Sequence, residues 1–544
     1  MHTSILHTIP VADFSSENKL FLDFVENPSD GLGGLLQGFS GNAAFWQDFL
    51  GAGAYGQKRA GSEWMRILDD VIELGKRAGT APAVLEKLEQ AKHDGVLFVV
   101  TGQQPAILGG PLITLYKAFS AVVLSNWLEK LLSRTVIPLF WVGSDDTDFQ
   151  EIRTLSTLSE DLSPLSTGIP ADAHESTAPV GDIAIDSVAR TWDSIARRLD
   201  AFPKGGFVRE CVSKALSAAR DNGEASAAVL ASLTGGQIAF ADGRSVHIRE
   251  CVGSLFSDYL EREESVKRVV IERGSRLESK GYHAQLSVGE DSGIFLMEGG
   301  KRRTVKREQL PLLREVIRQS VGRCSPGVIL RNLVQDSVFH PAAVILGPAE
   351  IAYRAQIADL YEEFEIPRPV VVPRLAATYI PAPLKEIVEG ETRDRINMLF
   401  QEPARFAAAI YEDAVPTEIE QAVSRFIKEV GGAVDVFQRT VNEAIHEKLR
   451  ARLAGRLSEL RKRVDQIREV EREAGKAAAL ERHPYLANVG SVVKPRGKPQ
   501  ERILSSLTPY LFSGETAAGI VRAAAEHYIH ELMDGNPSHI VYCG

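Results

Sequence analysis

The chain has only four cysteines among its 544 residues, and they are scattered: Cys211, Cys251, Cys324 and Cys543. No CxxC pair occurs, and the twelve histidines show neither HExxH nor another metal-binding spacing. We therefore predict no metal site built from these residues. Isolated thiols are typical of reduced cytosolic proteins, and we interpret Cys324 as a buried structural thiol rather than a nucleophile.

Long apolar runs are also missing. No run approaches the ~20 residues that a membrane-spanning helix needs, and Met1–His7 lacks the basic region and apolar core of a signal peptide. Excess positive charge is missing as well, because the formal net charge is −10, which argues against a general nucleic-acid binder. We expect a cytoplasmic protein that has neither a membrane nor a nucleic-acid partner.

What is present is the composition of a soluble globular protein, with 44% hydrophobic and 25% charged residues. A chain of 544 residues is too long for one hydrophobic core. We therefore expect two to four domains.

The most informative stretch begins at residue 95. An apolar run, Gly95–Thr101, is followed by a glycine-rich loop, Gly102–Pro111, and by a segment with helical periodicity, Leu112–Leu132. A second apolar run, Val136–Val142, leads into the acidic cluster Gly143–Asp148. Continuous apolar runs are typical of strands in a parallel sheet, and the helical segment supplies the crossover that a parallel pair needs. Both polar clusters fall at strand carboxyl ends, where such sheets bind ligands.

The glycine-rich loop has two interpretations. It precedes a helix, whose free N–H groups and dipole attract phosphate, so it could bind a nucleotide. It nevertheless reads neither GxGxxG nor the GK[ST] ending of a P-loop. The other interpretation is a tight turn that needs glycine for its backbone conformation.

The parallel-sheet pattern returns after residue 324. We predict that four runs are neighbours in one mainly parallel sheet: Val96–Val100, Val136–Val142, Val344–Leu346 and Val370–Val372. Residues 151–324 mix helix signals with short strand signals such as Gln237–Ala241. We interpret them as an insertion between two halves of a doubly wound α/β core.

From Pro383 to Lys476 the sequence is helical and heavily charged. Apolar residues recur there at 4-3-4-3 spacing, which is the a/d seam of a coiled coil: Leu453, Leu457, Leu460, Val464 and Ile467. One amphipathic helix on the protein's own core is the alternative to an antiparallel coiled-coil arm. We expect Pro416 and Gly431–Gly432 to break the helices that lead into the arm.

These patterns together predict five regions. They are a mainly helical region at 1–92, a core split between 93–150 and 325–380, an insertion at 151–324, a coiled-coil arm at 381–480, and a C-terminal region at 481–544 that packs on the core.

The acidic cluster offers three carboxylates at a predicted strand end: Asp145, Asp146 and Asp148. Three acids can bind Mg²⁺, an amino group or sugar hydroxyls. The alternative is capping of the next helix, which needs only one acid. We therefore favour a ligand role for the cluster.

A second group of candidates lies in the later motifs. Arg331 falls in an apolar run and needs an anionic partner, which is either Asp336 or a substrate carboxylate. Glu350 follows a Gly-Pro turn at a helix start, where it would complement the helix dipole. Tyr282 and Gln285 precede a predicted strand, and on their own they indicate only a loop.

Five of these motifs, in this order, resemble the BshC family of bacillithiol biosynthesis. They are Thr101–Lys117, Phe140–Phe149, Gly281–Gln285, Ser325–Asp336 and Gly347–Tyr353. The resemblance covers nearly the full length, including the arm and the Pro-Gln-Glu-Arg502 region. It implies a Rossmann-like α/β core similar to class I aminoacyl-tRNA synthetases and nucleotidyltransferases, with insertions and a coiled coil that helps to form a homodimer. It also implies a reaction in which the carboxyl of cysteine is joined to the amine of glucosaminyl-malate.

The sequence departs from that family at two motifs. The loop that takes the place of the synthetase HIGH motif has no histidine here. Where relatives often read GEDHDF, Asp146 and Asp148 match, whereas Asp145 replaces Glu, Ser144 replaces Gly and Thr147 replaces His. Thr147 cannot transfer a proton as a histidine could.

The leading hypothesis is a ligase that uses ATP or ADP, with Mg²⁺ as a further candidate, to activate the carboxyl of cysteine as an adenylate or acyl-phosphate. Two rivals remain: a nucleotide-binding scaffold that recruits a partner through the arm, and a pantothenate-synthetase-like nucleotidyltransferase acting on another acid and amine. The residues expected in the site are as follows: catalytic, Asp145, Asp146, Asp148, Lys117 and Arg331; substrate-binding, Gln103, Gln104, Tyr282, Gln285, Gln335, Asp336, Glu350, Tyr353 and Arg374; cofactor-binding, Gly102, Gly109, Gly110 and Arg502.

Overall fold

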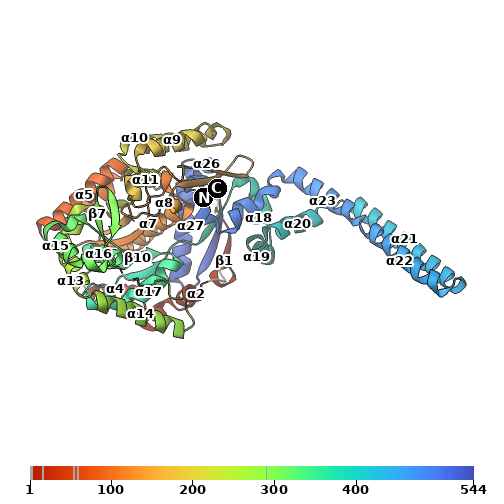
Figure 1. The fold of residues 1–544 in the computed structure, drawn as a ribbon. Coiled ribbons are helices and arrows are strands. Elements are labelled where there is room, and N and C mark those ends of the chain that lie inside the picture. The colour runs from red at the N-terminus through yellow and green to blue at the C-terminus, as the bar shows by residue number, and fades with distance from the viewer. Residues whose placement is uncertain (1–3, 15–17, 53–54, 58–60, 290) are drawn as a thin grey trace. The chain divides into compact units, whose positions relative to one another are not determined.

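The computed structural model describes residues 4–14, 18–52, 55–57, 61–289 and 291–544. The chain forms two compact units (Figure 1). Unit 1 comprises Met1–Glu160, Pro164–Pro381 and Pro495–Gly544, and unit 2 comprises Asp161–Ser163 and Ala382–Lys494. These contacts do not test the finer division into five regions, which stays a prediction.

The core of unit 1 is a five-stranded sheet whose neighbouring strands are all parallel. Its strands are buried because they are apolar on both faces, as the sequence pattern predicts. The four predicted runs do share this sheet, so the predicted α/β class with a Rossmann-like parallel sheet is confirmed. In sheet order the strands are β11 (Val370–Pro373), β10 (Ala343–Leu346), β2 (Leu97–Gln103), β3 (Val136–Val142) and β6 (Ala239–Asp242).

The fifth strand, β6, corrects the interpretation of residues 151–324 as an insertion alone. β6 pairs with β3 in parallel, with Leu139 opposite Ala239. Its four residues include two alanines and give only a weak strand signal, so the sequence does not indicate where it pairs. The segment thus contributes an edge strand of the core sheet.

Crossover helices connect the parallel strands. Helix α7 (Leu112–Leu132) joins β2 to β3 and is buried over most of its length, packing on both strands. Helix α17 (Pro348–Glu363) joins β10 to β11 in the same way. Each crossover returns the chain to the same edge of the sheet, so the carboxyl ends of β2, β3 and β10 lie together.

Three smaller sheets complete unit 1. β1 (Ile5–Pro10) pairs antiparallel with β13 (Ser538–Cys543), which pairs in parallel with β12 (Ala377–Ile380), so segments from both ends of the chain share one sheet. β7 (Ile294–Glu298) pairs antiparallel with β8 (Lys301–Thr304) and β9 (Cys324–Pro326). β4 (Thr154–Leu158) and β5 (Pro164–Gly168) form a hairpin.

Further helices of unit 1 surround these sheets (Figure 1). The longer ones are α2 (Lys19–Glu26), α4 (Ala43–Ala52), α5 (Ser62–Ala78), α6 (Pro82–Ala91), α9 (Ile185–Ala196), α10 (Gly205–Ala218), α11 (Asn222–Leu233), α13 (Gly253–Glu261), α14 (Glu263–Ser279), α15 (Leu310–Ser320), α16 (Val328–Phe339) and α27 (Thr516–Met533). Shorter ones are α8 (Phe149–Ile152), α12 (Val246–Cys251), α25 (Gln500–Ile503) and α26 (Thr508–Ser513).

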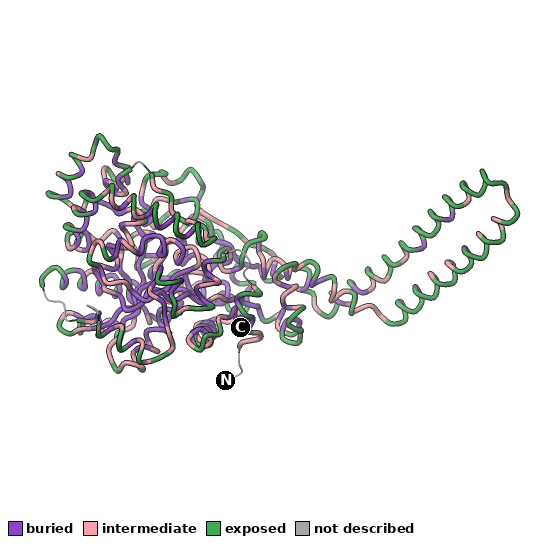
Figure 2. Tube along the Cα trace, turned by 90° about the horizontal axis from the view of Figure 1, so that it is seen from below, coloured by how far each residue is buried: buried purple, intermediate pink, exposed green. Residues whose placement is uncertain are grey.

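Unit 2 is helical and contains a long helical hairpin. Its helices are α18 (Lys385–Glu389), α19 (Arg393–Gln401), α20 (Pro403–Asp413), α21 (Thr417–Ala444), α22 (Glu447–Asp465), α23 (Arg468–Arg482) and α24 (Val489–Val493). Helices α21 and α22 pack side by side (Figure 2), and an ion pair joins Arg461 to Asp435 across them. The expected break at Gly431–Gly432 is wrong, because α21 continues through both glycines.

The predicted apolar seam of α22 is only partly buried in the hairpin. Leu457 and Val464 are buried, and Leu453 and Ile467 are half-buried. Leu460 is 42% exposed, so the hairpin leaves this seam residue largely unburied. A coiled coil with a second chain stays a prediction. None of the helices in the described ranges is long and apolar enough to cross a membrane.

Candidate functional site

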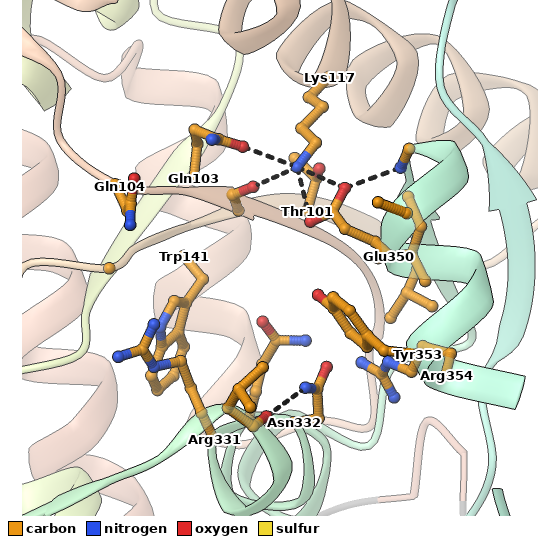
Figure 3. Close-up of a pocket in the computed structure, with 18 of the residues that line it drawn as sticks. Thr101, Gln103, Gln104, Lys117, Trp141, Arg331, Asn332, Glu350, Tyr353 and Arg354 are labelled. Carbon is orange, nitrogen blue, oxygen red and sulfur yellow. Dashed lines mark hydrogen bonds and ion pairs between the residues drawn. The ribbon is translucent and has the colours of Figure 1, made fainter. Parts of the chain in front are cut away.

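A cavity of about 320 Å³ opens at the carboxyl ends of β2, β3 and β10, a size typical of small-molecule sites. Side chains of helices α7, α16 and α17 line it (Figure 3), and residue 502 completes its wall. The predicted site residues that line it are Gly102, Gln103, Gln104, Lys117, Asp146, Arg331, Gln335, Glu350, Tyr353 and Arg502.

Lys117 lies buried on α7, and its ammonium group is fully hydrogen-bonded. It donates to the carbonyl of Gly102 at 2.8 Å, to Gln103 Oε1 at 2.9 Å and to Glu350 Oε1 at 2.7 Å (Figure 3). Burial lowers the pKa of Lys117, although the Glu350 carboxylate counteracts it. Because an ammonium group has three N–H donors, Lys117 holds β2 to α17 and has no donor left for a ligand.

Glu350 is fixed at the start of α17 from two sides. Besides its pair with Lys117, its Oε2 accepts a hydrogen bond from the backbone N–H of Gly347 at 2.7 Å. This position near the helix N-terminus is the one that complements the helix dipole, as the sequence indicated. Tyr353, one turn further along α17, points its hydroxyl into the cavity (Figure 3).

Arg331 enters the opposite side of the cavity from α16 and pairs with two aspartates that follow β3. Its Nη2 lies 3.4 Å from Asp145 Oδ1, and its Nη1 lies 3.2 Å from Asp146 Oδ2. Arg331 therefore pairs with Asp145 and Asp146 rather than with Asp336, and a substrate carboxylate as a further partner stays a prediction. The pairing also explains how three acids can follow one strand, since an arginine offsets their repulsion.

Asp145 and Asp146 differ in access to the cavity. Asp145 is 1% exposed, accepts a hydrogen bond from Ser325 at 2.7 Å and lies 3.8 Å from Arg249 Nη2, so it belongs to a buried ionic cluster behind the wall. Asp146 lines the cavity and accepts a hydrogen bond from Gln104 at 2.9 Å. Burial would raise the pKa of both carboxyls, but Arg331 together with the neighbouring cations and hydrogen-bond donors outweighs burial and holds both pKa values below the ordinary value.

Asp336 lies next to the cavity in a second buried pair. It pairs with Arg354 and accepts hydrogen bonds from Tyr361 at 2.7 Å and from Gln335 at 2.9 Å. Burial raises the pKa of Asp336. Gln335 and Arg354 line the cavity, so Asp336 orients cavity residues and does not line the cavity itself.

Four predicted residues lie away from the cavity in structural roles. Asp148 is exposed and caps α8 by accepting from Glu151 N–H at 3.2 Å, which is the capping alternative. Arg374 is buried in a pair with Glu501. Gly109 and Gly110 have φ values of 84° and 70°, and a Cβ on Gly109 would lie 2.7 Å from Val229. These two glycines serve the turn, as the backbone interpretation of the loop requires.

The Gly281–Gln285 motif also lies outside the cavity lining. The Tyr282 hydroxyl donates to Asp23 on α2 at 2.8 Å, and burial together with Asp23 raises the pKa of Tyr282 to about 12. Gln285 is exposed in the segment that precedes β7. Their expected convergence with the acidic cluster on one cleft is therefore wrong.

Sequence reasoning missed several residues of the cavity wall: Thr101, Trp141, Glu151, Asn332 and Arg354. Thr101 and Trp141 could have been predicted, because they lie in predicted strands close to the carboxyl ends, where parallel sheets bind ligands. Glu151 and Asn332 follow predicted site residues by three positions and one position, respectively. Arg354 directly follows the predicted Tyr353, but its orientation depends on the buried Asp336, which the sequence does not reveal as its partner.

A protein-family model, "Bacillithiol biosynthesis BshC, N-terminal Rossmann-like domain", matches residues 8–375. The chain belongs to the BshC family. Relatives named "Putative cysteine ligase BshC" include one from Natranaerobius thermophilus, 29% identical over 64% of this chain and 67% of its own length. A relative with the same name from Koribacter versatilis is 24% identical over 92% of this chain and 93% of its own length.

The solved structures that the chain matches include one titled as a putative arginyl-tRNA synthetase from Campylobacter jejuni. It covers 84% of this chain and 98% of its own, with 11% identity and a TM-score of 0.24. That score is too low to carry a conclusion. The relation of this BshC chain to aminoacyl-tRNA synthetases therefore stays a prediction.

Proposed function

We propose that this protein is a ligase that joins the carboxyl of L-cysteine to the amine of glucosaminyl-malate, the last step of bacillithiol biosynthesis. The observation that carries the proposal is the match to the BshC family model over residues 8–375, which contain most of the cavity lining. The names of the relatives support the same reaction.

The charges in the cavity suit the proposed substrates. Glu151 and Asp146 provide negative charge for an amino group, and Arg502 provides positive charge for a carboxylate or phosphate. Cysteine is a zwitterion and glucosaminyl-malate carries carboxylates, so both signs are needed. We propose that Asp146, Arg331, Gln104 and Gln335 bind the substrates.

Amide formation from a free carboxylate is uphill in water, so we propose that ATP, when bound, activates the carboxyl. The first N–H group of α7 is not available to a phosphate, because Leu112 N–H donates to the carbonyl of Leu504 at 2.7 Å. The start of α16 has no side-chain cap, and Val328 and Arg331 of this helix line the cavity. We therefore propose that the first turn of α16 and Arg502 would hold phosphate, in place of Gly109 and Gly110.

A thiol profile tests the function. The chain is expressed in a bacillithiol-producing strain that lacks its own cysteine ligase, and cellular thiols are labelled and quantified. We expect the native chain to restore bacillithiol and to deplete glucosaminyl-malate. A strain that still accumulates glucosaminyl-malate, although the chain is expressed and folded, would reject the ligase.

A matched pair of variants connects this activity with the cavity. Asp146→Asn removes a carboxylate that lines the cavity and holds Arg331, so we expect at least a tenfold loss of product thiol. Asp148→Asn changes an exposed helix cap two positions away, and we expect near-native product. Equal losses in the two variants would place the chemistry elsewhere.

We also propose that two copies associate through the α21–α22 hairpin. Several large apolar side chains of unit 2 are exposed on it or next to it: Phe426, Val436, Phe437, Leu449, Leu460 and Val470. Exposed apolar residues that gather on one element are typical of an interface. Burying them in a partner hairpin would account for the part of the seam that the hairpin itself leaves open.

A further inference from the structure

Arg502 differs from the other cations of the cavity because no carboxylate of the described residues forms an ion pair with it, although its charge attracts that of Glu151. Lys117 bonds to three acceptors, Arg331 pairs with two aspartates, and Arg354 pairs with Asp336. The Arg502 side chain is exposed and lines the cavity, and within the described ranges its guanidinium group has no hydrogen bond or ion pair. A ligand anion would therefore find a free charge at Arg502.

The two residues before Arg502 fix its position. Gln500 is 2% exposed; its Oε1 accepts from Tyr379 N–H and its Nε2 donates to the Tyr379 carbonyl, both at 2.8 Å. Glu501 forms a two-point ion pair with Arg374, in which Nη1 lies 2.9 Å from Oε2 and Nη2 contacts Oε1. The short helix α25 is thereby held to β12 and to the end of β11.

Arg374 cannot bind a substrate, although its sequence position predicted a substrate-binding role. Its side chain is 4% exposed, both terminal nitrogens contact Glu501, and Nη1 also donates to the Leu375 carbonyl at 2.8 Å. A planar guanidinium that holds a carboxylate at two points fixes orientation as well as distance. Arg374 therefore orients Glu501 rather than a ligand.

We propose that Arg374 and Glu501 are positioning residues that hold Arg502 against the cavity, where Arg502 binds an anionic group of the ligand, a carboxylate or a phosphate. The inference rests on the proposed function, because the proposed reaction names the ligands that carry these anionic groups. It assigns the C-terminal segment at 500–502 a direct part in binding, although the family model ends at residue 375.

A double-mutant cycle on the full chain tests this assignment. Binding of two probes, ATP and L-malate, is measured by calorimetry for the native chain, Arg502→Ala, Glu501→Gln and the double variant. We expect Arg502→Ala to weaken at least one probe about tenfold or more, and Glu501→Gln to weaken the same probe. In the Arg502→Ala background Glu501→Gln should change the affinity less than twofold, because its effect passes through Arg502.

The probes distinguish the two sources of the anion. A loss confined to ATP assigns a phosphate to Arg502, and a loss confined to L-malate assigns a carboxylate. Lys498→Ala is the matched control, since it removes an exposed cation of the same segment that does not line the cavity. Its affinity for either probe should stay within twofold of native.

Folding is checked by the thermal midpoint, because Glu501→Gln leaves Arg374 buried without its carboxylate. If that variant does not fold, Glu501→Asp keeps the charge and shortens the reach, and the same cycle applies. Native affinity in a folded Glu501 variant, additive losses in the cycle, or no binding of either probe to the native chain would each overturn the inference. A native chain that binds a probe but makes no bacillithiol would reject the ligase and leave the positioning intact.

Discussion

Glu151 differs from the other carboxylates that line the cavity. Asp146 pairs with Arg331 and Glu350 pairs with Lys117, whereas Glu151 has no ion-paired cation among the described residues. Burial is the largest of the causes that raise its pKa. A carboxylate with a raised pKa is the stronger base, so Glu151 is suited to accept the proton that the attacking amine releases.

We therefore predict that Glu151→Gln lowers the rate of amide formation about 10²-fold, the usual order for loss of a general base. In the native chain activity should rise with pH through the pKa of Glu151, because only the ionised form accepts a proton. In the variant that rising limb should vanish. Rates measured against pH check this, and an unchanged limb would assign the proton to another group.

His539 makes a prediction about stability rather than catalysis. It is 3% exposed, stacks on Phe14 and is hydrogen-bonded to Thr378, and burial followed by the charge of Arg374 lowers its pKa from 6.5 to about 3. The folded chain keeps His539 neutral, whereas the unfolded chain takes up a proton on this side chain below pH 6.5. The free energy of unfolding is therefore fully retained above pH 6.5 and falls as the pH drops toward 3.

Between pH 6.5 and pH 3 the free energy of unfolding should fall by up to about 1.4 kcal/mol for each pH unit. Thermal midpoints of native chain and His539→Gln, taken from pH 7 to pH 4, measure it. We expect a flatter pH dependence for the variant, which has no group to protonate there. Parallel curves would show that other groups set the acid sensitivity.

The ion pairs of the site are the part of it that could not be predicted from the sequence. Arg331 and Asp146 are 185 positions apart, and Arg374 and Glu501 are 127 apart. Spacing identifies each charged residue as one that needs a partner, but it does not say which opposite charge the fold brings near. Ser325 opens one of the five motifs, but neither its spacing nor that of Arg249 predicts that both lie next to Asp145.

At the scale of elements the sequence is far more informative. The predicted helix Leu112–Leu132 has the same bounds in the structure, and the four apolar runs are strands of one sheet. Length and apolar continuity decide these elements locally, so they can be predicted. β6 is short and alanine-rich, and its membership of the sheet depends on packing that no local pattern encodes.

The glycine-rich loop allows a test of its structural role. Gly109→Ala places a Cβ 2.7 Å from Val229 at a φ of 84°, so we expect a loss of about 1–3 kcal/mol in the free energy of unfolding. Gly432→Ala is the matched control, because this glycine lies inside α21 with open space around it. It should be neutral or stabilising by about 0.5–1 kcal/mol.

Denaturant unfolding of both glycine variants measures these changes. Each transition is assigned to its unit, since two compact units need not unfold together. A destabilised Gly432→Ala, or a native-like Gly109→Ala, would contradict the roles given to these glycines.

At the scale of the whole molecule, the proposed dimer can be separated from the hairpin fold. Phe437 and Leu460 are 49% and 42% exposed, so Phe437→Glu with Leu460→Glu should abolish association and leave the hairpin folded. Sedimentation should change from a dimer to a monomer mass with unchanged helical signal. Leu457→Glu is the contrast, because Leu457 is buried and its replacement should disturb the hairpin itself. A dimer that persists in the exposed double variant would exclude this interface.

The segment around residues 500–506 has a consequence for biosynthesis. It supplies Arg502 to the cavity, its Leu504 carbonyl caps α7, and Ser506 donates to the carbonyls of Gly109 and Pro111. A ribosome has therefore made all five strands of the core sheet more than 120 residues before it makes the piece that completes the pocket. Until that piece emerges, a nascent chain holds an unfinished pocket, and ligand binding first becomes available after residue 502 has been added.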